Sequence, residues 1–303
     1  MRILVTGCNG LFGSAMVRRL RETRPGDELL GVDLTAPVAI AGEACDLTDP
    51  DATAAAVAGL APELVFHFAG RVAGTDADAV ASALVATTRS VLAALAAHAP
   101  TAVFVLPGSA AEYGTLPAGR AAFSEDDAPA PVSNYGRAKA AQTAVALGAA
   151  DDGLDVRVGR VFNLIGPGVS PAFLIGSVAS QLAAIAAGDA EPRLSLGPLS
   201  SVRDFVDVRD ACDGLLAIAE RGVAGRVYNV CSGVGRTSRN AVEAMVGCSG
   251  LDVEIVEASS GSPRTGLDAS VGDPDRISAE CGWLPRIAFE DSACDAVSSA
   301  LVR

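Results

Sequence analysis

Two side chains that could move a proton lie four residues apart: Tyr135 and Lys139, the only lysine of the chain. On a helix, positions i and i+4 share one face, so the phenol and the ammonium would point into the same cleft. A free phenol has a pKa of about 10, and a neighbouring ammonium favours the phenolate. We therefore expect a pKa of Tyr135 nearer to neutrality, where the phenol exchanges a proton with a carbonyl or alcohol oxygen.

A serine completes the set of candidate catalytic residues. Ser109 follows a predicted strand over residues 102–106, in the sequence LPGSAAEYG. Parallel sheets bind ligands at the carboxyl ends of their strands, so a hydroxyl at this position can reach the same substrate oxygen as Tyr135. We predict that Ser109, Tyr135 and Lys139 act together on one carbonyl or hydroxyl group.

Three glycines with the spacing GxxGxxG follow the first predicted strand and open the first predicted helix: Gly7, Gly10 and Gly13. Gly7 permits a sharp turn, Gly10 lets a diphosphate approach the backbone, and Gly13 lets the helix pack closely on the sheet. The amino end of the helix adds free N–H groups and a positive dipole end. This turn predicts a dinucleotide cofactor. The other residues of the turn that we expect to contact it are Asn9, Leu11 and Phe12.

Asp33 closes the second predicted strand, where a carboxylate accepts hydrogen bonds from the adenine ribose. The same carboxylate would repel a 2′-phosphate, so NAD is favoured and NADP is the alternative. Lys139 would also hold the hydroxyls of the nicotinamide ribose. The remaining predicted cofactor contacts are Asp46, Leu47, Ala69, Gly70, Tyr135 and Phe162.

The elements that must position these residues alternate along the first half of the chain. Continuous apolar runs predict strands over residues 2–6, 28–33, 64–69, 102–106 and 156–161. Helical spacing of apolar residues predicts helices over 11–22, 50–59, 77–98, 133–148, 173–187, 208–220 and 238–247. Buried strands separated by helices predict an α/β fold with a doubly wound parallel (Rossmann) sheet.

We expect two parts of unequal regularity. Residues 1–163 would form the NAD(P)-binding Rossmann domain, with returns to its sheet near 200–230. Residues 164–303 would form most of a smaller, interleaved substrate-binding lobe, with residues 259–266 as an exposed loop.

Charge and composition exclude several classes of protein. Half of the residues are hydrophobic, and 23 basic against 36 acidic residues give a net charge of −13. No basic block suits nucleic acid, no uninterrupted apolar run reaches membrane-spanning length, and no signal peptide precedes the glycine turn. Seven scattered cysteines and two histidines predict no metal site and reduced, mostly buried thiols in a cytoplasmic protein. Two alanine-rich helices, 77–98 and 133–148, suggest a homodimer.

Together, TGxxGxxG, Ser109 and the pair Tyr135-xxx-Lys139 resemble the short-chain dehydrogenase/reductase superfamily. Three later segments resemble its extended branch, which acts on nucleotide sugars: residues 160–168 (RVFNLIGPG), 203–210 (RDFVDVRD) and 228–233 (YNVCSG). The stretch 166–210 is most similar to the GDP-4-keto-6-deoxymannose reductases. The substrate-binding residues that this resemblance implies are Ser109, Asn163, Phe173, Arg203 and Arg264.

Two positions depart from the family pattern. Ala83 stands where many relatives have an asparagine near the nicotinamide, and Pro263 precedes Arg264 where relatives commonly have Arg-Pro. A third position bears on the reaction. The related 4,6-dehydratases resemble this chain but need an Asp-Glu pair after the active-site hydroxyl, where this chain has Ala110 and Ala111. Dehydration by that route is therefore disfavoured.

The expected activity is an NAD(P)-dependent 4-keto reductase acting on a nucleotide-linked 4-keto-6-deoxy sugar, with Tyr135 as the proton donor. One alternative is a nucleotide-sugar 4-epimerase that retains NAD, because it needs the same three catalytic residues. A second alternative is an idle, cofactor-sensing protein.

Overall fold

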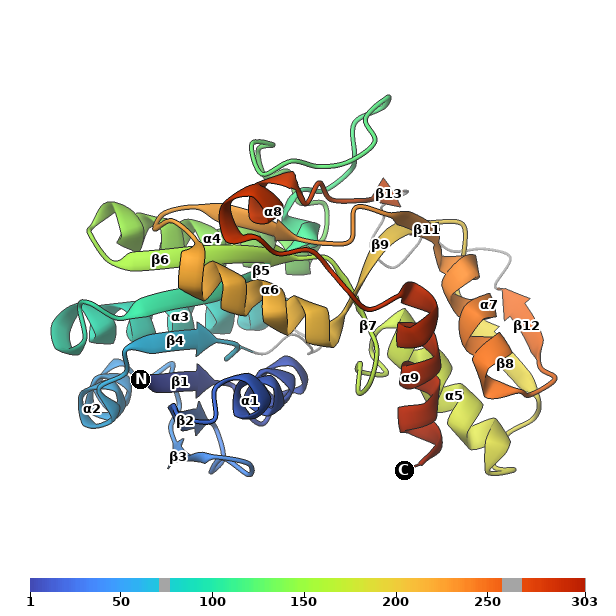
Figure 1. Cartoon of the computed structure of the whole chain (residues 1–303), viewed down its shortest axis with the longest axis horizontal. Coiled ribbons are helices and arrows are strands. Elements are labelled where there is room, and N and C mark those ends of the chain that lie inside the picture. Colours follow the sequence, from blue (N-terminus) through green and yellow to red (C-terminus); the bar gives the residue numbers. More distant parts are fainter. Residues whose placement is uncertain (71–76, 258–268, 303) are drawn as a thin grey trace.

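A computed structural model describes residues 1–70, 77–257 and 269–302 (Figure 1). Its largest element is a seven-stranded, fully parallel sheet of order β3-β2-β1-β4-β5-β6-β10. The strands are β1 (Arg2–Thr6), β2 (Glu28–Asp33), β3 (Ala41–Ala44), β4 (Leu64–His67), β5 (Val103–Ser109), β6 (Asp155–Val161) and β10 (Val227–Val230). The chain builds outward from β1 to β3 and then continues on the other side from β4. The strand order therefore reverses between β1 and β4, and ligands bind at such a switch point.

Helices cover both faces of this sheet, so the doubly wound α/β fold is confirmed (Figure 1). One face packs against α1 (Leu11–Thr23), α6 (Val208–Arg221) and α8 (Asp275–Cys281). The other face packs against α2 (Pro50–Leu60), α3 (Ala77–His98) and α4 (Asn134–Asp151). The central strands are almost wholly buried because each contributes apolar side chains to both faces, as their continuous apolar sequences predict.

A smaller lobe lies beyond the carboxyl ends of the strands (Figure 1). Its central strand β9 (Val202–Asp207) pairs with β7 (Asn163–Ile165), β11 (Gly235–Thr237) and β13 (Ala269–Ser270). The other strands of the lobe, β8 (Arg193–Leu196) and β12 (Glu254–Glu257), pair with each other. Its helices α5 (Leu174–Ala186), α7 (Ser238–Ser249) and α9 (Phe289–Leu301) enclose a second apolar core.

The chain crosses between the two parts more than once. After β7 and α5 in the lobe, it returns to the large sheet through α6 and β10, and again through α8, before it ends in α9. Within the return segment that the sequence placed near 200–230, β10 joins the large sheet, whereas β9 belongs to the small one. The division at residues 163 and 164 stays a prediction, and the expected loop 259–266 lies outside the described residues.

The five strands and seven helices predicted from the sequence are present, with ends that differ by a few residues. The short strand β3 was not predicted because its sequence AGEA is exposed at every position and carries no apolar pattern. The strands of the lobe were missed because they are short and lack the continuous apolar runs of the large sheet, although β9 is almost wholly buried. They contain two to six residues and lie within turn-rich sequence.

One cysteine prediction is wrong. Cys248 in α7 and Cys294 in α9 form a disulfide across 46 residues, whereas we expected reduced thiols throughout. Sequence spacing could not predict this pair, because only the packing of α7 on α9 brings their Cα atoms to 5.0 Å. The other five cysteines are free, and four of them are buried.

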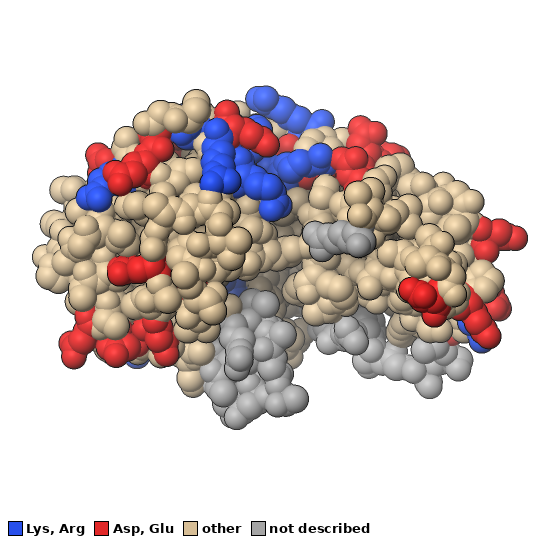
Figure 2. Space-filling model, turned by 90° about the horizontal axis from the view of Figure 1, so that it is seen from below, with Lys and Arg blue, Asp and Glu red and all other residues tan. Residues whose placement is uncertain are grey.

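Surface charge is distributed unevenly. Seen from below, basic side chains gather along one edge of the molecule and acidic ones lie toward both ends (Figure 2). Several arginines pair with carboxylates of the neighbouring helix, as Arg19 of α1 does with Asp213 of α6 at 2.5 Å. Arg24 makes a second such pair with Glu220. These ion pairs fasten α1 to α6 on one face of the sheet.

Helix α3 is apolar enough to meet the criteria for a membrane-spanning helix, although charged residues interrupt its sequence. The 18 residues Ala81–His98 have a mean hydropathy of 1.2, so length and composition alone would permit a membrane span. In the structure 44% of this stretch is buried, and α3 packs between α2 and α4. Core helices of globular proteins have the same character.

A substitution at Gly13 would test how closely α1 packs on the glycine turn. A Cβ atom at this position would lie 2.1 Å from the carbonyl oxygen of Gly7, so the turn and the helix would have to separate. We expect Gly13→Ala to lower the free energy of unfolding by about 3 kcal/mol, the upper range for overpacking, as measured by urea denaturation. The control is Gly247→Ala in α7, where no atom lies within 4 Å. That variant should gain up to about 1 kcal/mol, and equal behaviour of the two variants would contradict the argument.

Candidate functional site

The predicted residues meet at the carboxyl edge of the large sheet, where the strand order reverses. The glycine turn follows β1, Ala69 and Gly70 follow β4, and Ser109 ends β5. Parallel strands bring their carboxyl ends to one edge, so residues more than one hundred positions apart in the sequence become neighbours.

The glycine turn forms a cradle with little room to spare. Gly7 has a φ of +67°, and a Cβ atom on it would lie 2.7 Å from the amide nitrogen of Ala69. Helix α1 begins at Leu11, and its N-cap Gly10 provides no side-chain hydrogen bond. The first N–H groups of the helix therefore keep their capacity for an anionic ligand. Phe12 packs its ring on Phe68, with the ring centroids 4.9 Å apart.

Asp33 and Asn9 join the glycine turn to the segment after β2. One carboxylate oxygen of Asp33 accepts a hydrogen bond from the amide of Asn9 at 2.9 Å, and the other accepts one from the amide of Leu34. The amide nitrogen of the Asn9 side chain donates to the carbonyl oxygen of Ala36, and its oxygen accepts from the amide of Val38. Residues 34–38 contain no lysine or arginine that could pair with a 2′-phosphate.

The remaining predicted cofactor residues have different surroundings. Asp46 is exposed, and its carboxylate accepts from the hydroxyl and the amide of Thr48, which lowers the pKa of Asp46. Leu47 is buried in the core beneath α2 and α3. Gly70 has a φ of +145°, and Phe162 is buried beside Tyr113.

The three candidate catalytic residues converge from β5 and α4. Ser109 caps the short 3-10 helix η1 (Ala110–Glu112), and Ser133 caps α4, in whose first two turns Tyr135 and Lys139 lie. The phenol of Tyr135 lies close enough to Ser109 for the serine to affect its pKa. The ammonium of Lys139 is buried and donates to the carbonyl oxygen of Pro107 and to Oε1 of Gln142, both at 2.6 Å.

The expected effect of the lysine on the tyrosine is wrong for these surroundings. Burial raises the pKa of Tyr135 to about 12, opposed by the nearby side chain of Ser109. Lys139 does not lower it, because the ammonium donates toward Pro107 and Gln142 instead. Burial also lowers the pKa of Lys139 to about 8, against the attraction of Glu112. A protonated phenol at neutral pH suits a proton donor.

A buried ion pair behind Ser109 was not predicted. The Glu112 side chain is fully buried, and Nε of Arg160 lies 2.9 Å from one of its carboxylate oxygens. The other oxygen accepts from the amide of Ser109 and the hydroxyl of Thr143. The guanidinium of Arg160 also stacks on the ring of Tyr113, at 4.5 Å. The sequence held a signal for this pair, since Glu112 and Arg160 are charged residues within apolar surroundings.

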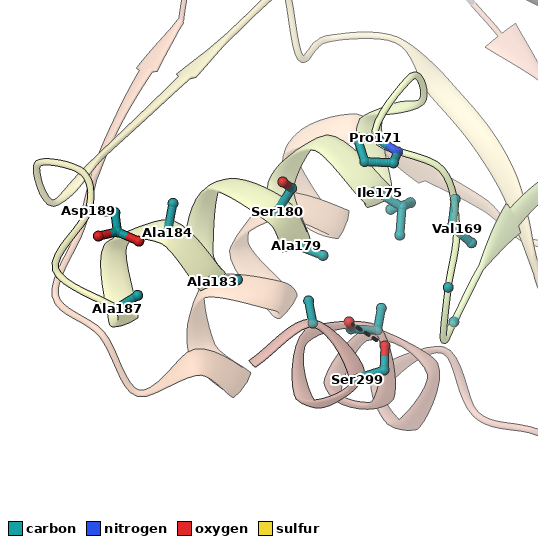
Figure 3. Close-up of a pocket in the computed structure, with 15 residues that line it drawn as sticks. Val169, Pro171, Ile175, Ala179, Ser180, Ala183, Ala184, Ala187, Asp189 and Ser299 are labelled. Atoms are coloured by element: carbon teal, nitrogen blue, oxygen red, sulfur yellow. Dashed lines mark hydrogen bonds between the residues drawn. The ribbon is translucent and has the colours of Figure 1, made fainter. Parts of the chain in front are cut away.

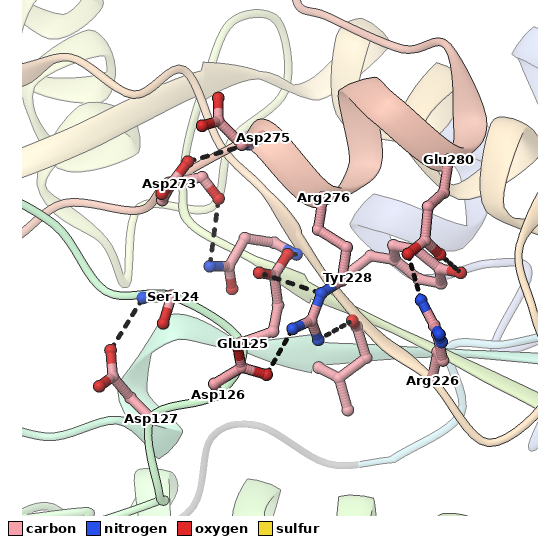
Figure 4. A network of polar contacts seen from close by, with 12 residues as sticks. Ser124, Glu125, Asp126, Asp127, Arg226, Tyr228, Asp273, Asp275, Arg276 and Glu280 are labelled. Carbon is pink, nitrogen blue, oxygen red and sulfur yellow. Dashed lines mark hydrogen bonds and ion pairs between the residues drawn. The ribbon is translucent and has the colours of Figure 1, made fainter.

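The segment between Ser109 and Tyr135 is fastened to the far edge of the sheet (Figure 4). The hydroxyl of Tyr113 donates to Asn229 at 2.7 Å, and the amide of Asn229 donates to the carboxylate of Glu125 at 2.7 Å. Arg276 of α8 lies 2.5 Å from Asp126 and pairs more loosely with Glu125. These contacts position the connection that sets the distance between Ser109 and Tyr135.

The residues implied for substrate binding are only partly brought together. Asn163 of β7 and Arg203 of β9 lie on neighbouring strands of the small sheet, and the Asn163 amide donates to the carbonyl oxygen of Asp204. Phe173 is about half exposed just before α5. Arg264 lies outside the described residues.

A groove of about 400 Å³ between α5 and α9 lies apart from this site (Figure 3). Ile175 and Ala179 of α5 face Ser299 of α9 across it. None of the predicted catalytic or cofactor residues lines the groove, so we do not assign the catalytic site to it. Among the residues that the structure describes, no group of three His, Cys, Asp or Glu side chains could hold a metal ion.

Comparisons with known proteins find related sequences and a related fold. The sequence profile described as "NAD dependent epimerase/dehydratase family" matches residues 3–231. The chain is 30% identical to GDP-6-deoxy-D-mannose reductase of Pseudomonas aeruginosa, over 96% of this chain and 94% of that protein. It is 34% identical to dTDP-6-deoxy-L-talose 4-dehydrogenase (NAD(P)(+)) of Kitasatospora kifunensis, over 96% and 93%. A solved structure described as "RMD from Pseudomonas aeruginosa complexed with NADPH" matches with a TM-score of 0.88 at 28% identity, covering 100% of this chain and 99% of that one.

His67 provides a test of the buried surroundings of the site. It ends β4, and burial lowers its pKa to about 3, so the folded protein keeps it neutral where the unfolded chain binds a proton. Between about pH 6.5 and pH 3, this group should therefore lower the free energy of unfolding by up to about 1.4 kcal/mol per unit of falling pH. We expect the loss between pH 6 and pH 4 to be smaller in His67→Gln, measured by urea denaturation. Equal slopes in both proteins would contradict the assignment.

Proposed function

Because the chain belongs to the NAD dependent epimerase/dehydratase family, within the extended short-chain dehydrogenases/reductases, we propose that it reduces the C4 carbonyl of a nucleotide-linked 4-keto-6-deoxy sugar. The chain is an NAD(P)-dependent nucleotide-sugar enzyme, as its family and relatives show. The observation that carries the finer proposal is the meeting of Ser109 at the end of β5 with Tyr135 and the buried Lys139 of α4, one strand from the switch point of the sheet.

The residues present fit a nicotinamide dinucleotide. Gly7 and Gly13 let the turn pack tightly, since a Cβ atom on either would collide with neighbouring backbone atoms. The amino end of α1 is not capped by a side chain, and Asp33 lies beside the turn. The glycine turn would hold the diphosphate, and Asp33 would bind the adenine ribose. When bound, the reduced cofactor supplies a hydride.

The catalytic side chains then bind and protonate the oxygen of the reacting carbonyl. Ser109 donates a hydrogen bond to the C4 oxygen, and Tyr135 transfers its phenolic proton to that oxygen as C4 is reduced. The carbonyl gains one hydride and one proton and becomes an alcohol, and the phenolate of Tyr135 regains a proton from solvent. Lys139 holds the nicotinamide ribose through the N–H bond of its ammonium that neither Pro107 nor Gln142 accepts.

Dehydration of the sugar is disfavoured by the surroundings of Ser109. A 4,6-dehydration needs carboxyl groups that remove and return protons at the sugar ring. Ala110 and Ala111 follow Ser109, and the nearest carboxylate is that of Glu112. Glu112 is fully buried and bound by Arg160, Thr143 and the amide of Ser109, so it is not available to move a proton.

Two nucleotides are candidates for the substrate, GDP and dTDP. The GDP-linked sugar follows from the similarity of residues 166–210 and from the reductase of Pseudomonas aeruginosa. The dehydrogenase of Kitasatospora kifunensis has a dTDP-linked sugar in its name and is somewhat more identical to this chain. Both are 6-deoxy sugars, which supports the sugar class more strongly than the base.

Stoichiometry tests the proposed reaction. Incubation with GDP-, dTDP- and UDP-linked 4-keto-6-deoxy sugars should consume one NAD(P)H for each product molecule, as measured by absorbance and chromatography. We expect Tyr135→Phe to bind the cofactor normally but to turn over two to four orders of magnitude more slowly, because it lacks the phenolic proton.

Other outcomes select the alternatives. Product without net consumption of cofactor would show an epimerase with retained NAD. Cofactor binding without turnover of any sugar would show the sensing protein. Near-normal turnover of Tyr135→Phe would reject Tyr135 as the proton donor.

Asp33 should determine the choice between the two dinucleotides. Its carboxylate would repel a 2′-phosphate, so we propose that NADH is the preferred cofactor. Asp33→Asn should raise the ratio of kcat/KM for NADPH to that for NADH by about tenfold, which corresponds to about 1.4 kcal/mol. Asp252→Asn is the matched control, since Asp252 is exposed and lies in the smaller lobe, between α7 and β12. If both variants change the ratio equally, Asp33 does not determine it.

The homodimer stays a prediction. Small side chains, Ala93 and Ala97 on α3 and Ala141 and Ala144 on α4, are exposed on the outer faces of these helices and would suit close packing of a second copy. Sedimentation velocity would measure the mass of the assembly.

A further inference from the structure

A continuous chain of buried hydrogen bonds runs from the glycine turn to Lys139. Thr6 lies 2.8 Å from Nδ1 of His67, whose Nε2 lies 3.1 Å from the hydroxyl of Thr88. Nε2 of Gln142 donates to the same hydroxyl at 2.8 Å, and Oε1 of Gln142 accepts from Lys139 at 2.6 Å. These residues come from β1, β4, α3 and α4, and each is at least 93% buried.

The directions of the bonds at His67 follow from the contact of Thr88 with Leu84 and from the neutral state of the imidazole. The hydroxyl of Thr88 donates its single proton to the carbonyl oxygen of Leu84 at 2.9 Å, so its oxygen can only accept from His67. Nε2 of His67 therefore carries a hydrogen. Because burial lowers the pKa of His67 and keeps the imidazole neutral, Nδ1 carries none and accepts from the hydroxyl of Thr6. The oxygen of Thr6 in turn accepts from the amide of Ala69 at 3.2 Å, beside Gly7.

The other end of the chain is equally determined. An ammonium has three donors and no acceptor, so Gln142 must turn its oxygen to Lys139 and its nitrogen to Thr88. Two of the three N–H bonds of Lys139 are directed to Pro107 and Gln142. Among the described residues the third has no acceptor, which leaves it for a ligand in the site.

We propose that Thr88 and Gln142, oriented by neutral His67, are positioning residues that hold the ammonium of Lys139 in its working direction and link it to the glycine turn. This inference rests on the proposed function only for the role of Lys139. A single acceptor could let the ammonium rotate, but two acceptors on different elements, Pro107 and Gln142, fix its third N–H bond. The chain thereby couples the part of the site that would bind the diphosphate to the part that would bind the nicotinamide.

Other ionisable groups around the ammonium come from each packed element. Glu112 of η1 attracts it, neutral His67 of β4 lies close enough to be affected by its charge, and Tyr135 shares its helix. Gln142 is uncharged, so its effect on Lys139 acts through the hydrogen bond that it accepts. Removing that acceptor should disfavour the charged form of the lysine.

The composition of the chain allows a direct test by NMR. Lys139 is the only lysine, so untagged protein labelled with 13C at lysine Cε gives one side-chain signal to titrate. We expect Gln142→Leu to lower the pKa of Lys139 by about one unit and Gln142→Glu to raise it by at least about one unit. Thr88→Val, which keeps the shape but not the hydroxyl, should lower it as well, whereas Thr88→Ser should restore the wild-type value.

The NMR signals of the two histidines can show the direction of the hydrogen bonds at His67. His67 and the exposed His98 are the only two, so 15N-histidine spectra of the same protein contain one signal set for each. His67 should remain neutral at pH 7 with its hydrogen on Nε2. In turnover assays, Thr88→Val should lower kcat about tenfold with the KM of the sugar within twofold, and Thr88→Ser should recover kcat.

These measurements separate failure of this inference from failure of the proposed function. An unchanged pKa of Lys139 in Gln142→Leu and Gln142→Glu, or His67 with its hydrogen on Nδ1, would overturn the inference even if the protein reduces a keto sugar. The expected shifts in the NMR titration together with no reductase activity would leave the positioning chain intact and reject the proposed reaction. If Thr88→Val does not fold, Thr88→Ser and the two Gln142 variants still decide.

Discussion

One buried ammonium places the strictest demand on this structure. Removing a positive charge from water is costly unless hydrogen bonds and opposite charges compensate for it. Lys139 finds this compensation in the carbonyl oxygen of Pro107, the amide oxygen of Gln142 and the charge of Glu112. Strand β5, helix η1 and helix α4 must therefore keep a fixed arrangement, and the same arrangement brings Ser109 to Tyr135.

Binding of an anionic ligand by an acidic chain depends on local fields rather than on net charge. The chain carries −13 overall, yet the amino end of α1 directs uncapped N–H groups toward the crevice. Close packing makes this possible, because Gly7 and Gly13 leave no space for side chains between the turn and the sheet. Glycine at positions 7 and 13 therefore serves both close packing of the turn and exposure of the N–H groups to an anionic ligand.

The smaller lobe has an apolar core of its own, which lies between α5, α7 and α9. Under the proposed function the lobe would present Asn163 and Arg203 to the substrate. Strands β7 and β9 emerge from the region of the sheet edge and carry Asn163 and Arg203, and the buried carboxylate of Asp204 binds the backbone at Ser232 and Gly233. Because the chain passes between the two parts several times, the lobe is anchored to the sheet at several points.

The sequence by itself determined the doubly wound fold, and it predicted the glycine turn and the Ser-Tyr-Lys set, whose roles stay predictions, because periodicity and short motifs are local properties of a chain. Residues 2–6 and 28–33 were predicted as strands with the bounds that β1 and β2 have. It could not determine the disulfide between Cys248 and Cys294, the ion pair of Glu112 with Arg160, or the path from Thr6 to Lys139. Each of these joins residues from separate elements, and only their packing sets the distance between them. The pKa of Tyr135 belongs to the same group: the sequence placed an ammonium one turn away, but burial and the direction of that ammonium decided the sign of the shift.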